Sequence, residues 1–419
     1  MGLEILFYLC GMFIERELYR ELLSYIPDKR FAIITGARQV GKTTILRELY
    51  AELSRGGHKV DFLSLEDPLI RAAANEHPEQ IFRSLREKPR RILDGLAPEK
   101  QFLLLDEVQY ADDPSHLLKY LYDTYEGNLK IIATGSSAFY IDRQFRDSLA
   151  GRKRIFRLSG LDFREYLQFS GKEELAIELD ALRQRSDYQS RYVEDLRLLF
   201  WEYLRFGGYP AVALESDERE KQFVLDELKN AYVRRDVLDS KVSDETRFYR
   251  LFQLLADQTG NLVNKNSLGA DLQMDAKTVD HYLYVLQKCF HISLIKPFSR
   301  NLRKELTKMP KVYFNDLGMR NALLNRFETI PGRADKGQLL ENYYFLRLRQ
   351  QYSEEQLLFW RTTDQQEVDF VVRERPEAGM AFEVKWAESR TAENKYAGFS
   401  KSYPHFPLQI LTAEDFWSF

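Results

Sequence analysis

The chain has 419 residues, which is too long for one hydrophobic core and predicts several domains. Apolar residues make up 44% and charged residues 30% of the chain, as in ordinary globular proteins. The formal charge of −3 excludes a globally basic nucleic-acid binder and leaves room for local basic patches. The two cysteines lie far apart and lack zinc-site spacing, so we expect reduced thiols in a cytoplasmic protein.

Residues 1–26 are expected to form a short helical extension. Their apolar stretch, residues 3–14, is interrupted by Glu4, lacks a basic segment ahead of it and is too short to span a bilayer. No other stretch has the pattern of a membrane span, so no membrane partner is predicted.

Residues 27–162 alternate short apolar runs with amphipathic stretches. Strands separated by helices are typical of a parallel sheet covered on both faces, and they indicate an α/β domain. The expected strands are 31–35, 60–65, 102–106, 130–134 and 154–158, and the clearest expected helices are 43–54 and 115–125.

A complete phosphate-binding motif, G-x-x-x-x-G-K-T, follows the first strand and opens the first helix. In such a loop the glycine backbone wraps the phosphates, and the helix N-terminus favours anions. The motif predicts that Lys42 binds the β- and γ-phosphates of ATP and that Thr43 binds Mg²⁺. The expected cofactor-binding residues are Gly36, Ala37, Arg38, Gln39, Val40, Gly41, Lys42, Thr43 and Thr44.

Two carboxylates end the apolar run Phe102–Leu105. After a phosphate loop, this pattern indicates that Asp106 holds the magnesium ion, and that Glu107 acts as the general base that activates the attacking water.

Two later positions are weaker candidates for the same site. Ser136 follows the next strand and either positions water at the γ-phosphate or caps a helix. Arg152 follows Leu149-Ala150-Gly151. It either stabilises transition-state charge, often from a neighbouring subunit, or is a surface arginine in a basic cluster.

The motifs in this order resemble those of a prokaryotic family of AAA-like ATPases, related to the STAND class, with a C-terminal restriction-endonuclease-like domain of unknown function. The resemblance extends from about residue 13 to the C-terminus. It rests on residues 34–44, 105–109, 134–137, 149–152, 207–210, 232–236, 312–316, 367–370 and 383–385.

The resemblance implies a P-loop NTPase core with a parallel sheet (27–162), a helical lid (163–242), a winged helix (243–325) and a PD-(D/E)xK nuclease-like α/β domain (326–419). It also implies that Gly208 and Pro210, in the Gly-Gly-Tyr-Pro break of the lid, respond to the nucleotide. The alternative is a simple helix-breaking turn.

Three helical patterns between residues 248 and 288 resemble a helix-turn-helix that exposes Lys277, Thr278 and His281. The expected hairpin after them is rich in basic residues and could bind DNA phosphates as a wing, or could only carry a solvated charged surface. These residues are Arg300, Arg303, Lys304, Lys308 and Lys311.

Carboxylates near the C-terminus have the arrangement of a PD-(D/E)xK nuclease. Glu383 and Lys385 share one strand face, because side chains alternate along a strand. In this interpretation Asp369, Glu383 and Glu341 bind a metal ion and Lys385 steadies the nucleophilic water. The alternative is a retained fold with a structural lysine–glutamate pair.

Two functions remain open from the sequence. In the first, ATP hydrolysis by a homo-oligomer controls a metal-dependent nuclease that acts on DNA. In the second, the chain is an ATP-dependent regulatory switch or assembly protein whose nuclease-like domain is inactive and only binds partners.

Overall fold

The computed structural model describes residues 13–135, 151–185, 187–240, 242–299, 305, 308–387 and 396–417. They divide into two compact units: one holds the described residues up to Ser159 with 288–290, and the other holds residues from Gly160 onward without 288–290. In the parts of the chain so described, no helix is both long and apolar enough to cross a membrane.

The first unit contains a parallel five-stranded sheet with strand order β2-β3-β4-β1-β5. The expected α/β class, parallel sheet and strand positions are confirmed. Buried strands of this kind are apolar on both faces, as β1 and β3 are. The strands are β1 (Phe31–Thr35), β2 (Val60–Ser64), β3 (Gln101–Asp106), β4 (Leu129–Gly135) and β5 (Lys153–Arg157).

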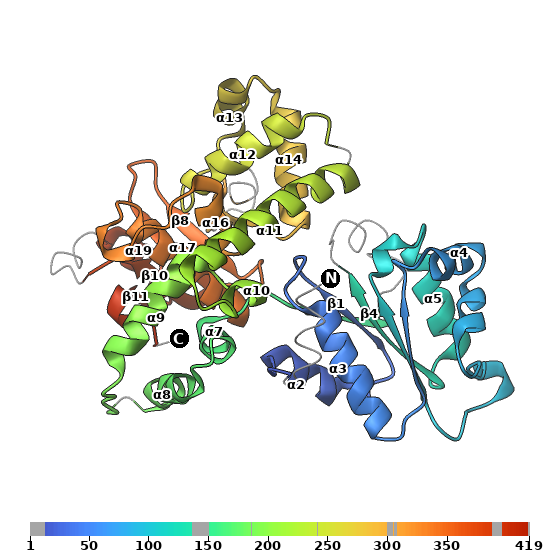
Figure 1. The fold of residues 1–419 in the computed structure, drawn as a ribbon. Coiled ribbons are helices and arrows are strands. Elements are labelled where there is room, and N and C mark those ends of the chain that lie inside the picture. The colour runs from blue at the N-terminus through green and yellow to red at the C-terminus, as the bar shows by residue number, and fades with distance from the viewer. Residues whose placement is uncertain are drawn as a thin grey trace. The chain divides into compact units, whose positions relative to one another are not determined.

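Helices cover both faces of this sheet, with α3 on one face and α4 and α5 on the other (Figure 1). Alternate residues such as Phe31 and Ile33 pack with Leu117 and Leu121 of α5. The helical elements are α2 (Glu17–Tyr25), α3 (Lys42–Arg55), α4 (Pro68–Glu76), η1 (Pro78–Ser84), η2 (Ile92–Asp94), η3 (Val108–Tyr110) and α5 (Pro114–Tyr125).

The second unit begins with helices and ends with a mixed sheet. Residues 160–290 contain α7 (Phe163–Phe169), α8 (Glu173–Gln184), α9 (Val193–Phe206), α10 (Pro210–Ala213), α11 (Glu218–Asp239), α12 (Glu245–Asp257), α13 (Lys265–Leu272) and α14 (Ala276–Lys288). The three helices α12 to α14 lie where the helix-turn-helix pattern placed them.

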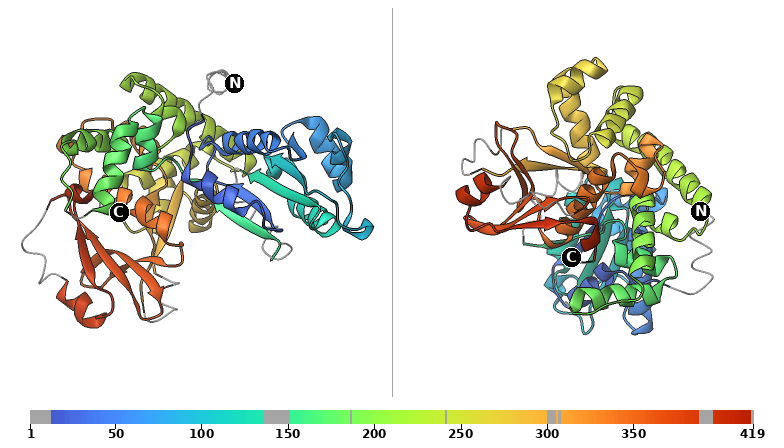
Figure 2. Two further views of the ribbon diagram at one scale, coloured as in Figure 1. Left: turned by 90° about the horizontal axis from the view of Figure 1, so that it is seen from below. Right: turned by 90° about the vertical axis from the view of Figure 1, so that its left-hand side faces the viewer.

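The second sheet has the strand order β11-β10-β9-β8-β6-β7 and is visible in Figure 2. Its strands are β6 (Ile292–Pro297), β7 (Lys311–Phe314), β8 (Leu357–Arg361), β9 (Glu367–Arg375), β10 (Ala378–Val384) and β11 (Leu408–Leu411). The hairpin β6–β7, expected in a separate winged helix, joins the C-terminal strands because β6 pairs with β8 in parallel.

The second sheet is packed on both faces. One face meets a core that includes Phe200 of α9 and Tyr343 and Tyr344 of α17, whereas the other meets Phe399 of α19. The remaining elements are α16 (Leu317–Leu324), η4 (Ile330–Gly332), α17 (Lys336–Gln351), α19 (Ala397–Ser402) and η5 (Ala413–Asp415).

Candidate active site

The phosphate-loop motif lies where β1 ends and α3 begins. Gly36 packs so closely on the neighbouring chain that a Cβ there would lie 2.0 Å from the carbonyl oxygen of Leu158. Gly41 precedes α3 with a φ of 99°, in the left-handed region that favours glycine. Both glycines are therefore required by the backbone path, and the loop ends at a helix N-terminus that favours anions.

Lys42 is buried in this loop, with 4% of its surface exposed. Its Nζ donates to the carbonyl oxygens of Gly36 at 3.1 Å and Ala37 at 2.7 Å. Burial lowers the pKa of Lys42 to about 8, although the nearby Glu107 carboxylate counteracts this. These two backbone carbonyls hold the ammonium group, and phosphate oxygens can replace them as acceptors.

The hydroxyl of Thr43 faces the carboxylate of Asp106 across the ends of α3 and β3. Thr43 Oγ1 donates to Asp106 Oδ2 at 3.0 Å, and the Thr134 hydroxyl at the end of β4 donates to Asp106 Oδ1. Burial raises the pKa of Asp106, and the hydrogen bond from Thr134 opposes that shift. Hydroxyl and carboxylate oxygens are the ligands that Mg²⁺ prefers, so these residues fit the ion.

Glu107 follows Asp106 in a left-handed backbone conformation with a φ of 55°. Its N–H donates to Thr134 Oγ1 at 2.9 Å, and Gln109 Nε2 donates to its carboxylate. Thr134 therefore contacts both acidic residues at the end of β4. Ser136 lies outside the described residues.

Arg152 lies at the opposite end of the strands from the phosphate loop. Its carbonyl accepts from Phe31 N, at the start of β1, whereas the loop follows Thr35 at the end of that strand. Its guanidinium donates to Asp123 Oδ1 at 2.7 Å. A five-residue strand spans about 16 Å, so Arg152 does not reach the loop of its own chain.

A second group of charged residues lies in the second unit around Lys311. This side chain is 1% exposed and contacts Glu367 Oε1 at 2.5 Å, Glu341 Oε1 at 3.1 Å and Asp369 Oδ1 at 3.4 Å. Tyr313, two residues along β7, donates to Glu341 Oε1 at 2.5 Å. A lysine ammonium thus occupies the space between the carboxylates that were expected to hold a metal ion.

The protonation of this lysine-centred cluster follows from burial and charge. Burial alone would lower the pKa of Lys311, but Glu341 and the neighbouring carboxylates outweigh it and hold that pKa well above its ordinary value. Burial and the Asp369 carboxylate raise the pKa of Glu341 to about 7, against the opposing effect of Lys311. Gly260 covers Glu341, since a Cβ there would lie 3.2 Å from both of its carboxylate oxygens.

Asp369 and Glu383 lie on the adjacent antiparallel strands β9 and β10. Glu383 accepts from Lys385 Nζ at 2.5 Å and from the Tyr396 hydroxyl at 2.6 Å, and Asp369 Oδ2 accepts from Val384 N at 2.9 Å. Burial, followed by the Asp369 carboxylate, raises the pKa of Glu383. Each acidic residue of the expected nuclease site therefore has a partner from the chain itself.

One expectation for this region needs correction: Lys311 is not part of an exposed basic wing, because it lies inside the carboxylate cluster. The metal-binding role expected of Glu341, Asp369 and Glu383 stays a prediction. In this structure the first two contact Lys311, and the third pairs with Lys385. Across the described ranges, no set of three or more acidic, histidine or cysteine side chains is arranged to hold a metal ion.

Sequence reasoning missed Lys311, Tyr313 and Glu367 as members of this group. The available signal was the alternation of polar Lys311 and Tyr313 with apolar Val312 and Phe314, which places two polar side chains on one face of a buried strand. Arg300, Arg303 and Lys304 lie outside the described residues.

The helix-turn-helix residues and the lid break are placed as follows. Lys277 and His281 are exposed on α14, whereas Thr278 is half-buried. Gly208 donates its N–H to Asp316 Oδ2 at 2.7 Å, and Pro210 is the first residue of α10. Neither lid residue belongs to the same compact unit as the phosphate loop.

Three family models match parts of the chain. Residues 28–167 match a family model described as an AAA domain, which supports an AAA-like ATPase domain in this part of the chain. Residues 336–413 match a domain of unknown function (DUF4143), and residues 197–329 match another (DUF8612). The two latter matches assign no activity to the second unit.

Similar proteins include the uncharacterized protein MJ1637 of Methanocaldococcus jannaschii, which is 29% identical over 75% of this chain and 66% of its own length. An uncharacterized protein of Haemophilus influenzae is 25% identical over 88% of this chain and 87% of its own. AMPPCP-bound DnaA from Aquifex aeolicus is 18% identical over 66% of this chain and 89% of its own, with a TM-score of 0.29. That score is too low to establish a shared overall fold.

Proposed function

We propose that the first unit binds ATP with Mg²⁺ and hydrolyses it. The loop from Gly36 to Thr44 would hold the phosphates, with Lys42 as their main cation. Thr43 and Asp106 would hold the magnesium ion, and Glu107 would accept the proton of the attacking water. The match of residues 28–167 to an AAA domain supports this proposal.

The observation that carries the proposal is the meeting of three side chains at one end of the sheet. Lys42 and Thr43 open α3, and Asp106 ends β3, with Thr43 Oγ1 3.0 Å from Asp106 Oδ2. A buried ammonium, a hydroxyl and a carboxylate beside a helix N-terminus match the charge of a magnesium–triphosphate group.

The test compares two buried lysines of the first unit. Lys42→Ala is expected to lower ATP turnover by about 100-fold or more, because the transferred phosphate loses its cation. Lys130 is the matched control: it is 1% exposed and donates to the carbonyls of Tyr25, Asp28 and Arg30, away from the loop. If both variants fold and Lys42→Ala and Lys130→Ala lose equal ATPase activity, the assignment of Lys42 as the phosphate-binding cation is rejected.

For the second unit we propose partner recognition without metal-dependent cleavage, so that the chain is an ATP-dependent switch. The position of Lys311 between Glu341 and Asp369 supports this over a nuclease, because its ammonium is already a cationic partner of both carboxylates. Incubating the full chain with supercoiled DNA, ATP and Mg²⁺ or Mn²⁺ tests it. Cleavage that Asp369→Ala abolishes would establish the nuclease instead.

A nucleic-acid partner is the second candidate, favoured by the exposure of Lys277 and His281 on α14. If α14 contacts phosphates, Lys277→Glu should weaken DNA binding and flatten its dependence on salt, since fewer counterions are released. Lys265→Glu is a nearby control, because Lys265 already pairs with Asp280. The absence of DNA binding by the unaltered protein at low salt would remove this candidate.

A further inference from the structure

The phosphate loop is joined directly to the segment that leaves the first unit. Leu158 N donates to the Thr35 carbonyl at 2.7 Å, and Gly36 packs on the Leu158 carbonyl with no space for a Cβ. The chain enters the second unit two residues later, between Ser159 and Gly160. Only Ser159 therefore separates Leu158, which contacts the phosphate loop, from Gly160, the first residue of the second unit.

Arg16 adds a second link between the same two segments. Its side chain lies just before α2 and is buried, with 6% exposure. Nη1 donates to the carbonyl of Val40 in the phosphate loop at 3.1 Å, and Nη2 donates to the carbonyl of Ser159 at 3.0 Å. One rigid guanidinium thus fixes the loop and the exit segment relative to each other.

On the far side of the Ser159–Gly160 peptide, the chain is joined to the lid break. Leu161 N donates to the Gly208 carbonyl at 2.6 Å, and Gly208 N donates to Asp316 Oδ2 at 2.7 Å. A Cβ at Gly208 would lie 2.2 Å from the Leu161 carbonyl oxygen, and one at Gly318 would lie 2.0 Å from that of Phe206. Three backbone segments are packed here without room for adjustment.

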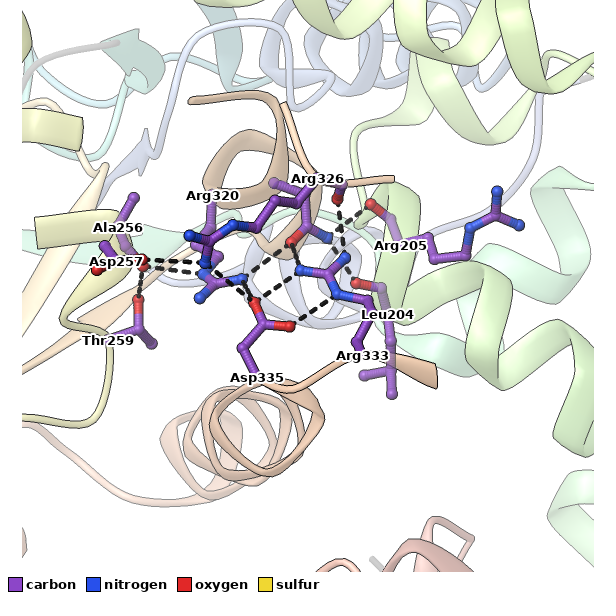
Figure 3. Close-up of polar contacts among 10 residues, drawn as sticks. Leu204, Arg205, Ala256, Asp257, Thr259, Arg320, Arg326, Arg333 and Asp335 are labelled. Atoms are coloured by element: carbon purple, nitrogen blue, oxygen red, sulfur yellow. Dashed lines mark hydrogen bonds and ion pairs between the residues drawn. The ribbon is translucent and has the colours of Figure 1, made fainter. Parts of the chain in front are cut away.

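Asp316 also begins α16, since its Oδ1 accepts from Met319 N at 2.8 Å. Figure 3 shows how α16 is connected to the rest of the second unit. Arg320 Nε donates to the Ala256 carbonyl of α12 at 2.9 Å and its Nη1 to Asp335 ahead of α17, while Asn321 Nδ2 donates to Leu204 in α9 at 2.9 Å. A displacement of α16 would reach three helices of the unit.

We propose that Arg16 is a positioning residue that couples nucleotide occupancy of the phosphate loop to the second unit, through Ser159 and the Leu161–Gly208–Asp316 contacts. The inference rests on the proposed ATP site. Lys42 now donates to the carbonyls of Gly36 and Ala37, so binding phosphates requires it to leave loop acceptors that adjoin Leu158. Arg16 binds both Val40 and Ser159. A movement of the loop backbone when Lys42 changes partners therefore also moves Ser159, at the end of the first unit.

The test measures hydrogen exchange of the amides of Leu161, Gly208 and Met319 in the full chain, with and without saturating Mg²⁺ and the non-hydrolysed analogue AMPPCP. Calorimetry records nucleotide affinity on the same samples. In the unaltered protein, the analogue is expected to change exchange at these amides about tenfold or more, equivalent to about 1.4 kcal/mol. In Arg16→Ala, saturated with the analogue, that change is expected to be lost.

Two further variants separate coupling from simple structural damage. Arg20 lies in the first turns of α2, is largely exposed and pairs with Glu15, so Arg20→Ala should keep the full response. Arg16→Lys keeps the charge but presents one ammonium in place of a two-armed donor, so the analogue should cause only part of the change in hydrogen exchange. This variant also provides the test if Arg16→Ala does not fold. A full response in Arg16→Ala or in Arg16→Lys would overturn the inference.

The two proposals fail in distinguishable ways. If the unaltered protein binds the analogue but shows no change at the three amides, the coupling role of Arg16 is rejected and the ATP site stands. If the unaltered protein binds no nucleotide at all, the proposed ATP site is rejected, and the coupling role falls with it.

Discussion

Lys311 Nζ lies 3.1 Å from Glu341 Oε1 in the interior of the second unit, and the lysine side chain is 1% exposed. A buried ion pair differs from a surface pair, because removing one partner leaves the other charge without compensation in a poorly solvated site. Substituting Lys311 therefore tests directly whether the carboxylate cluster is a structural ion-pair cluster or a metal-binding site.

We expect Lys311→Met to destabilise the second unit by about 3–5 kcal/mol, because Glu341, Glu367 and Asp369 are left to repel one another. Thermal unfolding measures the effect. Millimolar Mn²⁺ should then raise the melting temperature of Lys311→Met, since a divalent ion can replace the ammonium.

The exposed Lys308 supplies the matched control, and Lys308→Met should melt like the unaltered protein with and without Mn²⁺. A Mn²⁺-dependent rise in the unaltered protein would contradict the proposed role of Lys311, because it would mean that a metal ion binds while the lysine is present.

Glu107→Gln should slow ATP hydrolysis by about 100-fold to 10,000-fold and leave ATP affinity nearly unchanged. The general base is lost, whereas Lys42, Thr43 and Asp106 are retained. Single-turnover hydrolysis and equilibrium binding measure the two quantities separately. Turnover at the unaltered rate would show that another group accepts the proton.

ATP affinity should weaken as the pH rises through the pKa of Lys42, which is about 8. The ammonium is charged below this pH and neutral above it, so we expect roughly tenfold weaker binding at about pH 9 than at about pH 7. Lys42→Arg stays charged throughout and should lose this dependence. Parallel pH profiles for the two proteins would contradict the assignment.

Stability should depend on the protonation of Asp316, which is buried and whose pKa burial raises from 3.8 to about 6. The folded protein therefore takes up this proton at a higher pH than the unfolded chain does. Its contribution to the free energy of unfolding increases as the pH falls from about 6 to about 4, by up to about 3 kcal/mol. Urea unfolding at several pH values in this window measures the free energy of unfolding of the unaltered protein and of Asp316→Asn. The difference between the two should grow in favour of the unaltered protein as the pH falls. A constant difference would contradict it.

If Arg152 completes the active site of a neighbouring copy, specific ATPase activity should rise with protein concentration. Arg152→Ala should then lose turnover and keep ATP affinity. Because Arg152 pairs with Asp123, Asp123→Ala is the control for loss of that ion pair alone. A monomer in sedimentation with a concentration-independent rate would reject this role.

The first sheet and its phosphate loop could be predicted from the sequence because their signals are local. Buried parallel strands appear as continuous apolar runs, and β1, β3 and β4 lie within a residue or two of their expected positions. The loop motif implies a strand before it and a helix after it. Lys42 and Thr43 therefore lie near Asp106 once β1 and β3 belong to the same parallel sheet.

The partners of Lys311 and Arg16 could not be predicted in this way. Lys311 reaches Glu341 and Asp369 only because β6 pairs with β8, which brings residues 296–297 beside 358–359. Arg16 binds backbone carbonyls, which every residue carries, so no side-chain pattern marks its acceptors at Val40 and Ser159. Both depend on long-range packing.

The pairing of β6 with β8 also has a consequence for how the chain is made. A ribosome completes β6 some sixty residues, and β7 some forty residues, before it begins β8, counting from Pro297 and Phe314 to Leu357. Until then, the outer edge of β6 carries unsatisfied backbone groups that could pair with another nascent chain. Parallel pairing between distant segments is slow, so aggregation during synthesis should be most frequent in this interval. For the same reason, an expression fragment that begins after β7 would lack the strand that β8 needs beside it.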